Sequence, residues 1–133
     1  MKYFLDTNIC IYFLKGLFPE LRDQLLARTP VQIKIASIVK AELLLGAYKS
    51  NNPSRTGKSV TEFLLPFEIV PFDDQASENY SRIRGSLEKK GQSIGPNDLI
   101  LAATVVSNQG MLITNNVAEF GRVAGIKIDN WIA

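Results

Sequence analysis

Short apolar runs recur along the chain and are separated by longer amphipathic stretches. Runs of this kind, rich in Val, Ile, Phe and Tyr, are typical of buried strands. We expect strands at residues 2–5, 31–36, 68–72, 110–114 and 125–128. Pro71 lies in the third run and indicates an edge strand or a strand end, because proline cannot donate to a strand ladder.

Helical spacing of apolar positions predicts a helix or two between most of these strands. We expect helices at 9–14, 18–28, 37 to 46 or beyond, 60–66, 73 or 74 to 91, and 99–106. Residues 49–59 carry three basic side chains among Asn, Ser, Pro and Gly, which predicts a polar, turn-rich connection. Alternating strands and helices imply an α/β fold, with a parallel sheet covered by helices on both faces. Residues 1–133 are expected to form one domain.

One charged residue interrupts the first apolar run: Asp6 stands with Thr7 and Asn8 in the middle of residues 3–14. Charged side chains are rarely buried without a partner. Asp6 directly follows the first predicted strand, and ligands of open parallel sheets bind outside the carboxyl ends of the strands. We therefore expect the Asp6 carboxylate to point toward a ligand site at that edge.

Further acidic residues fall at comparable places. In "SIVKAELLLGA", helical spacing puts Glu42 on an apolar face with Ile38, Ala41 and Leu45. Asp98, in "GPNDLILAATVV", falls in the first turn of a helix that is apolar nearly all round. Asn115, Asn116 and Glu119 come just after the fourth predicted strand.

Each of these residues also has an ordinary structural interpretation. In this interpretation, Asp6 caps the helix that follows it, and Asp98 complements the dipole of its own helix. In the same interpretation, Glu42 pairs with a Lys or Arg, and the Thr-Asn-Asn segment forms only a turn. Against this, two carboxylates 4 Å apart repel by about 4 kcal/mol at an effective dielectric constant near 20. Three converging carboxylates need a cation, and oxygen ligands favour Mg²⁺, with Mn²⁺ as a substitute.

Composition narrows the chemistry. The chain has no histidine, which excludes Ser-His-Asp, Cys-His and histidine acid–base mechanisms. Its single cysteine, Cys10, permits no internal disulfide and is expected to be a buried packing residue. No apolar run is long enough for a membrane span, and Asp6 interrupts the only segment resembling a signal peptide. We expect a cytoplasmic protein whose mature chain starts at Met1.

Four stretches together resemble PIN domains: "FLDTNICIY", "SIVKAELLLGA", "GPNDLILAATV" and "LITNNVAEFGRV" followed by "IDNW". More narrowly, they are similar to the VapC-type toxin ribonucleases of type II toxin–antitoxin modules. The stretches span residues 3–131. The resemblance implies a three-layer α/β/α sandwich, a homodimer, Mg²⁺-dependent RNA cleavage and inhibition by a cognate antitoxin.

The family's acidic site maps onto Asp6, Glu42 and Asp98. Many relatives carry a fourth acid where this chain has Asn116, and Glu119, one helical turn onward, is an acid that can replace it. The resemblance implies that Asp6, Asp98 and Glu42 bind the metal. It also implies that the side chains near these acids orient them or the RNA phosphate; these are Thr7, Asn8, Thr114 and Asn116. Water activated by the metal would leave a 5′-phosphate and a 3′-hydroxyl.

RNA and an acidic site are both negative, so cations must line the rim of the site. The candidates are Lys40, Lys49, Arg55, Lys58, Arg82, Arg84, Lys89 and Lys90. Lys40, Lys89 and Lys90 are preferred, the last two because they directly precede the Asp98 segment. An antitoxin is expected to lay an apolar stretch in a groove between the early helices. The candidate lining residues are Tyr12, Phe13, Leu17 and Phe18, with ordinary core packing as the alternative for each. An antitoxin Arg or Lys that enters the acidic site is a further expectation.

Two other functions compete with the nuclease. Phosphoryl transfer on Asp6 is disfavoured because "DTN" lacks the second aspartate, two residues on, that dehalogenase-like phosphatases use. A catalytically silent PIN-fold module that binds RNA or protein is the main alternative, because Asn116 departs from the family pattern. For the nuclease, structured transfer RNA or ribosomal RNA is the expected substrate, with an initiator transfer RNA anticodon loop as the leading candidate.

Overall fold

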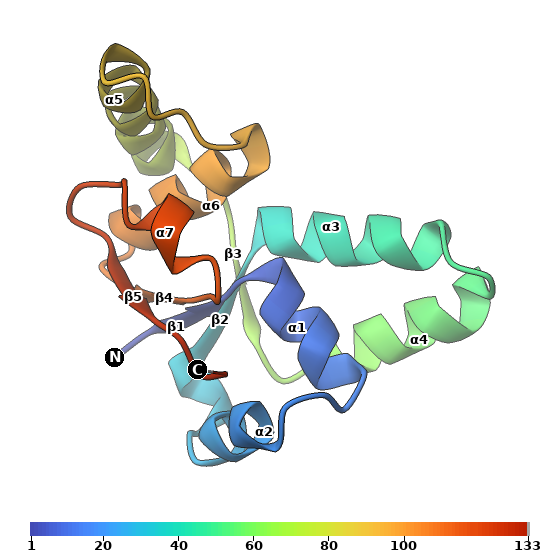
Figure 1. Ribbon diagram of the computed structural model, residues 1–133. Coiled ribbons are helices and arrows are strands. Elements are labelled where there is room, and N and C mark those ends of the chain that lie inside the picture. Colours follow the sequence, from blue (N-terminus) through green and yellow to red (C-terminus); the bar gives the residue numbers. More distant parts are fainter. Residues whose placement is uncertain (133) are drawn as a thin grey trace.

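A parallel sheet of five strands forms the centre of the computed structural model, which describes residues 1–132 (Figure 1). The strands are β1 (Tyr3–Leu5), β2 (Ile33–Ala36), β3 (Glu68–Val70), β4 (Met111–Ile113) and β5 (Lys127–Asp129). Their order is β3-β2-β1-β4-β5, and every neighbouring pair is parallel. The predicted number of strands is confirmed, and β3, which ends one residue before Pro71, is an edge strand.

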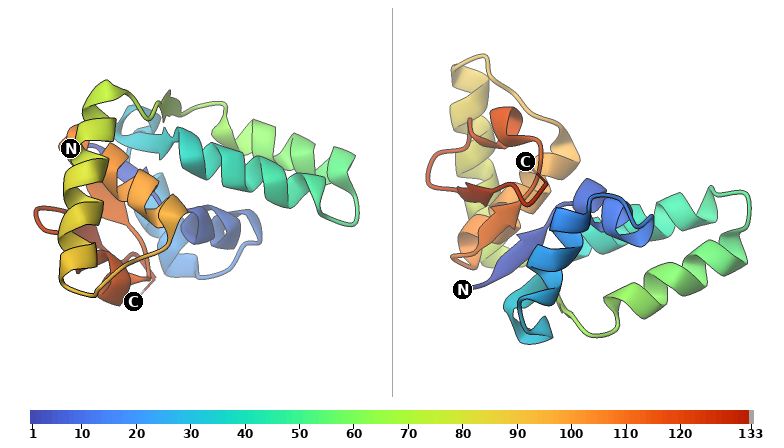
Figure 2. Two further views of the ribbon diagram at one scale, coloured as in Figure 1. Left: turned by 90° about the horizontal axis from the view of Figure 1, so that it is seen from above. Right: turned by 60° about the horizontal axis from the view of Figure 1, so that its bottom comes forward.

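Helices cover both faces of the sheet, which confirms the α/β/α sandwich (Figures 1 and 2). They are α1 (Thr7–Leu14), α2 (Pro19–Leu26), α3 (Ser37–Tyr48), α4 (Pro53–Leu64), α5 (Asp74–Lys89), α6 (Pro96–Ser107) and α7 (Val117–Phe120), with a 3₁₀ turn at Pro30–Gln32. Helices α3 and α4 run antiparallel and extend away from the sheet as a pair (Figure 2). Within residues 1–132, no helix has the length and apolar character needed to cross a membrane.

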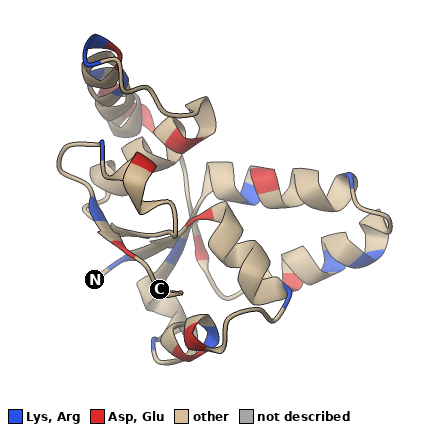
Figure 3. Cartoon of the chain, in the orientation of Figure 1, with Lys and Arg blue, Asp and Glu red and all other residues tan. Residues whose placement is uncertain are grey.

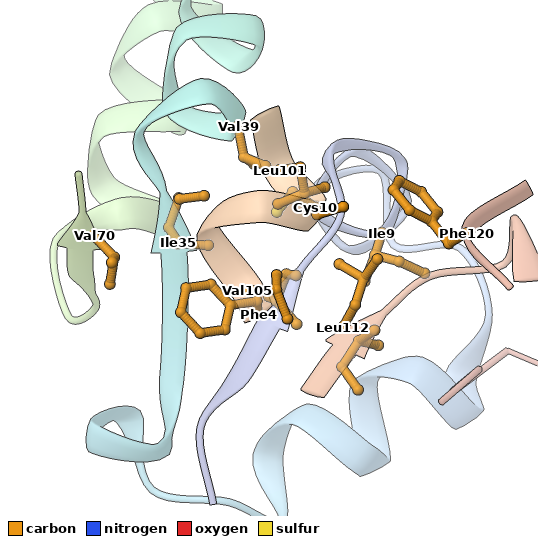
Figure 4. Close-up of a cluster of buried hydrophobic side chains, with 14 of the residues drawn as sticks. Phe4, Ile9, Cys10, Ile35, Val39, Val70, Leu101, Val105, Leu112 and Phe120 are labelled. Atoms are coloured by element: carbon orange, nitrogen blue, oxygen red, sulfur yellow. The ribbon is translucent and has the colours of Figure 1, made fainter. Parts of the chain in front are cut away.

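The core lies between the sheet and its helices (Figure 4). Phe4 and Leu112 point from the central strands into this core, and both are fully buried. Helix α6 is apolar nearly all round because it lies between the sheet and α5, so that Leu101 and Val105 are buried. Cys10 is also fully buried, and burial raises the pKa of its thiol, as expected for a packing residue.

The direction of winding reverses at the centre of the sheet. From β1 the chain moves outward to β2 and β3, and it then crosses back to β4 and β5. The carboxyl ends of β1 and β4 are therefore neighbours, with Leu5 opposite Ile113. Ligand sites of open α/β sheets form at this kind of switch point.

The prediction for residues 49–66 is wrong in detail. Helix α4 begins at Pro53, inside the segment predicted as a turn-rich connection, and it ends at Leu64. Asn52 caps it by accepting a hydrogen bond from the Arg55 N–H at 3.2 Å, and proline is favoured in a first helical turn. The polar residues of 53–59 face outward because only Val60 and Leu64 of this helix are buried.

Three smaller differences bear on the site. Helix α1 begins at Thr7 with Asp6 as its N-cap, so the capping alternative for Asp6 is confirmed as one of its contacts. Helix α7 was not anticipated, because a four-residue helix gives no readable periodicity. The buried face of α3 carries Val39 and Leu43, whereas Leu45, expected beside Glu42 on an apolar face, is exposed.

Gly110 should be intolerant of a side chain. A Cβ built there would lie 2.5 Å from Phe4 Cε1 and 3.1 Å from the Lys2 carbonyl oxygen. Since Phe4 is fully buried, Gly110→Ala should lower the free energy of unfolding by about 1–3 kcal/mol in urea titrations. Gly57→Ala, in open space within α4, is the matched control and should raise it by about 0.5–1 kcal/mol. Equal effects at the two positions would contradict the packing described here.

Candidate functional site

Asp6 lies at the carboxyl end of β1 and is 7% exposed. Its Oδ1 accepts a hydrogen bond from the Thr7 N–H at 2.7 Å, and its Oδ2 accepts one from the Thr114 hydroxyl at 2.7 Å. Burial raises the pKa of Asp6, and the nearby charges of Glu42 and Glu119 raise it further, while the two hydrogen bonds act in the opposite direction. The carboxylate is thus held in a fixed orientation but remains costly to ionise.

Thr114 ties the fourth strand to this carboxylate. It is fully buried directly after β4, and its backbone N–H donates to the Asp129 carbonyl oxygen at 3.1 Å. Its hydroxyl donates to Asp6 and accepts from the Asn116 N–H at 3.0 Å. The contact between Thr114 and Asp6 gives Thr114 the position expected of an orienting residue.

Glu42 projects from α3 toward the same edge. Its Oε1 accepts a hydrogen bond from the Thr7 hydroxyl at 2.6 Å, and its Oε2 accepts one from the Asn97 amide at 3.3 Å. Thr7 therefore connects the two acids, with its N–H on Asp6 and its hydroxyl on Glu42. Asn97 was missed by the sequence analysis, although it directly precedes Asp98 at the start of α6.

Asp98 is half-buried in the first turn of α6. No side-chain hydrogen bond to its carboxylate is present within residues 1–132, in contrast to Asp6 and Glu42. Loss of hydration raises the pKa of Asp98 to about 6, and the charges of Asp6, Glu119 and Glu42 contribute. Among Asp6, Glu42 and Asp98, the carboxylate of Asp98 is therefore the one whose charge is not stabilised by a side-chain hydrogen bond.

Glu119 completes the arrangement from α7. Its Oε2 accepts a hydrogen bond from the Asn116 amide at 2.7 Å, and its Oε1 lies 3.4 Å from the Gly95 N–H just before α6. Asn116 and Glu119 are thus joined by a hydrogen bond between their side chains. Asp6, Glu42, Asp98 and Glu119 are called the acidic cluster below; acidic positions at the end of β1 and on α3, α6 and α7 appear in Figure 3.

The acidic cluster suits a hard divalent cation by its donor chemistry, since every donor is a carboxylate oxygen. It is not a closed cage: in the described part of the chain, no three acidic or thiol groups stand together closely enough to hold an ion. Asp6, Glu42 and Glu119 each accept two hydrogen bonds, whereas Asp98 accepts none from a side chain of residues 1–132. Mg²⁺ commonly binds one or two carboxylates and keeps several waters, so an open site based on Asp6 and Asp98 fits it.

The remaining predicted residues make no hydrogen bond or ion pair to the acidic cluster within residues 1–132. Asn8 is exposed on α1, and its side chain makes no hydrogen bond to residues 1–132. Lys40 is exposed on α3, two residues before Glu42, and Lys89 and Lys90 are exposed at the end of α5. Figure 3 shows basic positions on both of these helices.

Two clefts adjoin the early helices. The larger, of about 770 Å³, lies between α1, α3 and α4, and Glu42 forms part of its wall. Its lining includes Leu14, Leu43, Ala47 and Val60. The smaller, of about 370 Å³, lies at the α1–α2 turn and is lined by Phe13, Leu17 and Phe18. Tyr12 lines neither cleft and packs edge-on against Phe18, with ring centres 5.3 Å apart.

Known proteins match this sequence and this fold. The model of the PIN domain family matches residues 3–126. The tRNA(fMet)-specific endonuclease VapC of Salmonella typhimurium is 36% identical over 131 residues, or 98% of each chain. Ribonuclease VapC2 of Rickettsia felis is 37% identical over 135 residues, again 98% of each chain.

A solved structure gives the same result in three dimensions. The crystal structure of DNA-bound VapBC from Salmonella typhimurium superposes with a TM-score of 0.93 at 36% identity, covering 98% of each chain. The expected resemblance is thus confirmed. PIN-domain ribonucleases are generally dependent on a divalent metal ion, and the oxygen donors of the acidic cluster agree with that requirement.

The pKa of Asp98 predicts how stability depends on pH in the absence of divalent ions. Because this pKa is about 6 rather than 3.8, the folded protein binds more protons than the unfolded chain between about pH 4 and pH 6. Stability should therefore fall as pH rises through that window. Asp98→Asn should raise the melting temperature by a few degrees at neutral pH. Near pH 4 the same substitution should change the melting temperature little.

Thermal melts in EDTA measure this effect, with Asp23→Asn on the exposed part of α2 as the control for losing one carboxylate. The control should leave the pH profile unchanged. An unchanged melting temperature of Asp98→Asn at neutral pH would show that the charge of Asp98 is not crowded.

Proposed function

Since the chain belongs to the PIN-domain family and, within it, to the VapC ribonucleases, we propose that it is a Mg²⁺-dependent endoribonuclease acting as the toxin of a toxin–antitoxin pair. The observation that carries this proposal is the acidic cluster itself. Burial raises the pKa of both Asp6 and Asp98, the charges of Glu42 and Glu119 raise both further, and the charge of Asp6 also raises that of Asp98. None of the four acids forms an ion pair within residues 1–132. A cation bound there relieves a repulsion that the protein does not relieve by itself.

Asp6 and Asp98 are the proposed direct metal ligands, with Glu42 binding directly or through water and Glu119 as a further catalytic acid. Mg²⁺ would supply charge neutralisation at the scissile phosphate and would acidify the attacking water. The protein holds the acids in place: Thr114 and the Thr7 N–H fix Asp6, and the Thr7 hydroxyl fixes Glu42. Asn116 holds Glu119, which leaves Asp98 as the carboxylate free to turn toward a ligand.

Structured RNA is the proposed substrate, since a relative from Salmonella typhimurium bears the name tRNA(fMet)-specific endonuclease. An initiator transfer RNA anticodon loop is the leading candidate for this chain, with ribosomal RNA as the other. Lys40, Lys89 and Lys90 are exposed on helices that carry or flank the acidic residues, and they are proposed to contact the RNA backbone.

A cognate antitoxin is the proposed protein partner, because solved relatives are VapBC complexes. The cleft between α1, α3 and α4 is apolar along Leu14, Leu43 and Val60 and reaches Glu42. An amphipathic antitoxin segment would bury its apolar side chains there and bring a cationic residue to the acidic cluster. We further propose a cytoplasmic homodimer in which residues 1–133 form one PIN domain, able to enter a larger toxin–antitoxin assembly.

A catalytically silent PIN module that only binds RNA or protein is the second candidate. It is favoured by Asn116 at the position of an acid and by the open form of the cluster, in which no three acids of the described chain enclose an ion.

RNA cleavage by antitoxin-free protein separates these two functions. Total bacterial RNA should yield discrete fragments with Mg²⁺ and none with EDTA, because the acidic cluster needs the cation to approach a phosphate. Asp98→Asn should lower the cleavage rate by at least about 10²-fold, the scale typical of losing an electrostatic catalytic group. Fragment ends carrying 2′,3′-cyclic phosphate would contradict attack by water, and no cleavage by folded wild type would favour the silent module.

Antitoxin binding in the large cleft is tested by neutralisation in cells. Leu14 lines the cleft and is 36% exposed, so Leu14→Asp places a charge where an apolar segment would dock. This variant should remain toxic when a candidate antitoxin is co-expressed, whereas wild type is neutralised. Leu65→Asp is the control, because Leu65 is exposed and lines neither cleft. Full neutralisation of Leu14→Asp would place the partner elsewhere.

A further inference from the structure

Two arginines from distant parts of the chain line one small cleft. Arg82 lies on α5, Arg122 follows α7, and Ser86 of α5 also lines the cleft. The other lining residues are apolar: Ile83, Leu87, Val123 and Ala124. The cleft has a volume of only about 30 Å³, so it admits one or two oxygen atoms of a ligand that otherwise lies outside it. Arg82, Ser86 and Arg122 are called the arginine cleft below.

The positive charge of the arginine cleft has no acidic counterpart. Arg82 Nη2 donates to the Asn79 Oδ1 at 2.8 Å, and Arg122 Nη1 donates to the Ser93 carbonyl oxygen at 3.2 Å; both acceptors are neutral. The ion pairs present within residues 1–132 are Lys34–Glu68 and Arg84–Glu88, and neither involves these two arginines. A guanidinium carries five donors, so each arginine keeps several for a ligand.

The arginine cleft is linked to the acidic cluster through one short segment. Arg122 holds the carbonyl oxygen of Ser93, and Glu119, three residues before Arg122, accepts from the N–H of Gly95. Gly95 directly precedes α6 and its Asp98. Residues 93–95 therefore contact Arg122 on one side and Glu119 on the other, so an RNA strand that leaves the acidic cluster across this segment would meet Arg122, which shares its cleft with Arg82.

We infer that the arginine cleft binds a backbone phosphate of the RNA a short distance along the strand from the bond that is cleaved. The inference rests on the proposed function. Two arginines that line one cleft without an acidic partner favour an anionic ligand, and the planar fork of a guanidinium matches the geometry of phosphate oxygens. The Ser86 hydroxyl adds a neutral donor. The contact is to the RNA backbone and positions the strand whatever its sequence.

The competing explanation is packing alone. Long arginine stems cover apolar surface while their heads stay in water, and Val123 and Leu87 provide such a surface here. Replacement by methionine separates the two explanations, because it keeps much of the apolar stem and removes the charge and the donors. Arg84 provides a matched control on the same helix, since it already pairs with Glu88 and lies against Tyr80.

The experiment measures binding of a fluorescein-labelled anticodon stem-loop RNA by fluorescence anisotropy, over a range of salt concentrations. All proteins carry Asp98→Asn, so that binding is read without cleavage. Arg82→Met with Arg122→Met should weaken binding about tenfold at low salt, and it should reduce the slope of log affinity against log salt by about 1.4, the value for two lost contacts to single-stranded RNA. Arg84→Met should change affinity less than twofold. Thermal melts confirm that each variant is folded.

Each outcome decides the inference. An unchanged salt slope in the double variant, an equal loss in Arg84→Met, or no RNA binding by the parent protein would overturn it. Arginine-dependent binding supports it even if the wild-type protein, assayed in parallel with Mg²⁺, cleaves no RNA; that result would refute the proposed nuclease while leaving the phosphate site in place. Cleavage by wild type together with unaltered binding of the double variant would refute the phosphate site and leave the proposed nuclease in place.

Discussion

Like-charge repulsion at the switch point of the sheet is the constraint on which the other features of the site depend. The topology brings the ends of β1 and β4 together, and α3, α6 and α7 each direct an acid to that place. Asp6 and Glu42 accept hydrogen bonds from Thr114 and Thr7, whereas Asp98 accepts none from a side chain of residues 1–132, and burial and its acidic neighbours raise the pKa of Asp98 to about 6. A protein gains nothing in stability from such an arrangement, which is why strongly perturbed acids in a cleft indicate function.

Charge also organises the surroundings of the acidic cluster. The large cleft that reaches Glu42 is apolar along α1, α3 and α4, which suits a protein segment better than a nucleic acid. On the other side, α5 and the segment after α7 present arginines without acidic partners, which suits a phosphate backbone. Antitoxin and RNA would therefore approach the same four acids from different sides, and an antitoxin cation could compete with the metal without occupying the RNA path.

The local pattern of apolar and polar residues was sufficient to predict much of this structure. The alternation of strands with helices predicted the parallel sheet, and Pro71 predicted the end of an edge strand. The places of Asp6, Glu42 and Asp98 in apolar segments made them candidates, and the structure brings the three side chains to one edge of the sheet. The errors fall where tertiary contacts outweigh local signals: α4 is stabilised by an Asn52 cap and by packing on α3, although its sequence is polar. The contact of Thr114 with Asp6 joins residues 108 positions apart, and the Asn97 contact with Glu42 joins residues 55 apart, so neither is visible to periodicity.

Binding of Mn²⁺ to the metal-free protein is the most direct test of the claim that the acidic cluster is a divalent-cation site. Electron paramagnetic resonance counts free Mn²⁺, and no RNA or antitoxin is needed. We expect wild type to bind Mn²⁺, to lose it to excess Mg²⁺, and to bind far more weakly as Asp6→Asn or Asp98→Asn, while Asp23→Asn on α2 binds as wild type does. Equal Mn²⁺ binding by all four proteins, or none by folded wild type, would contradict the account.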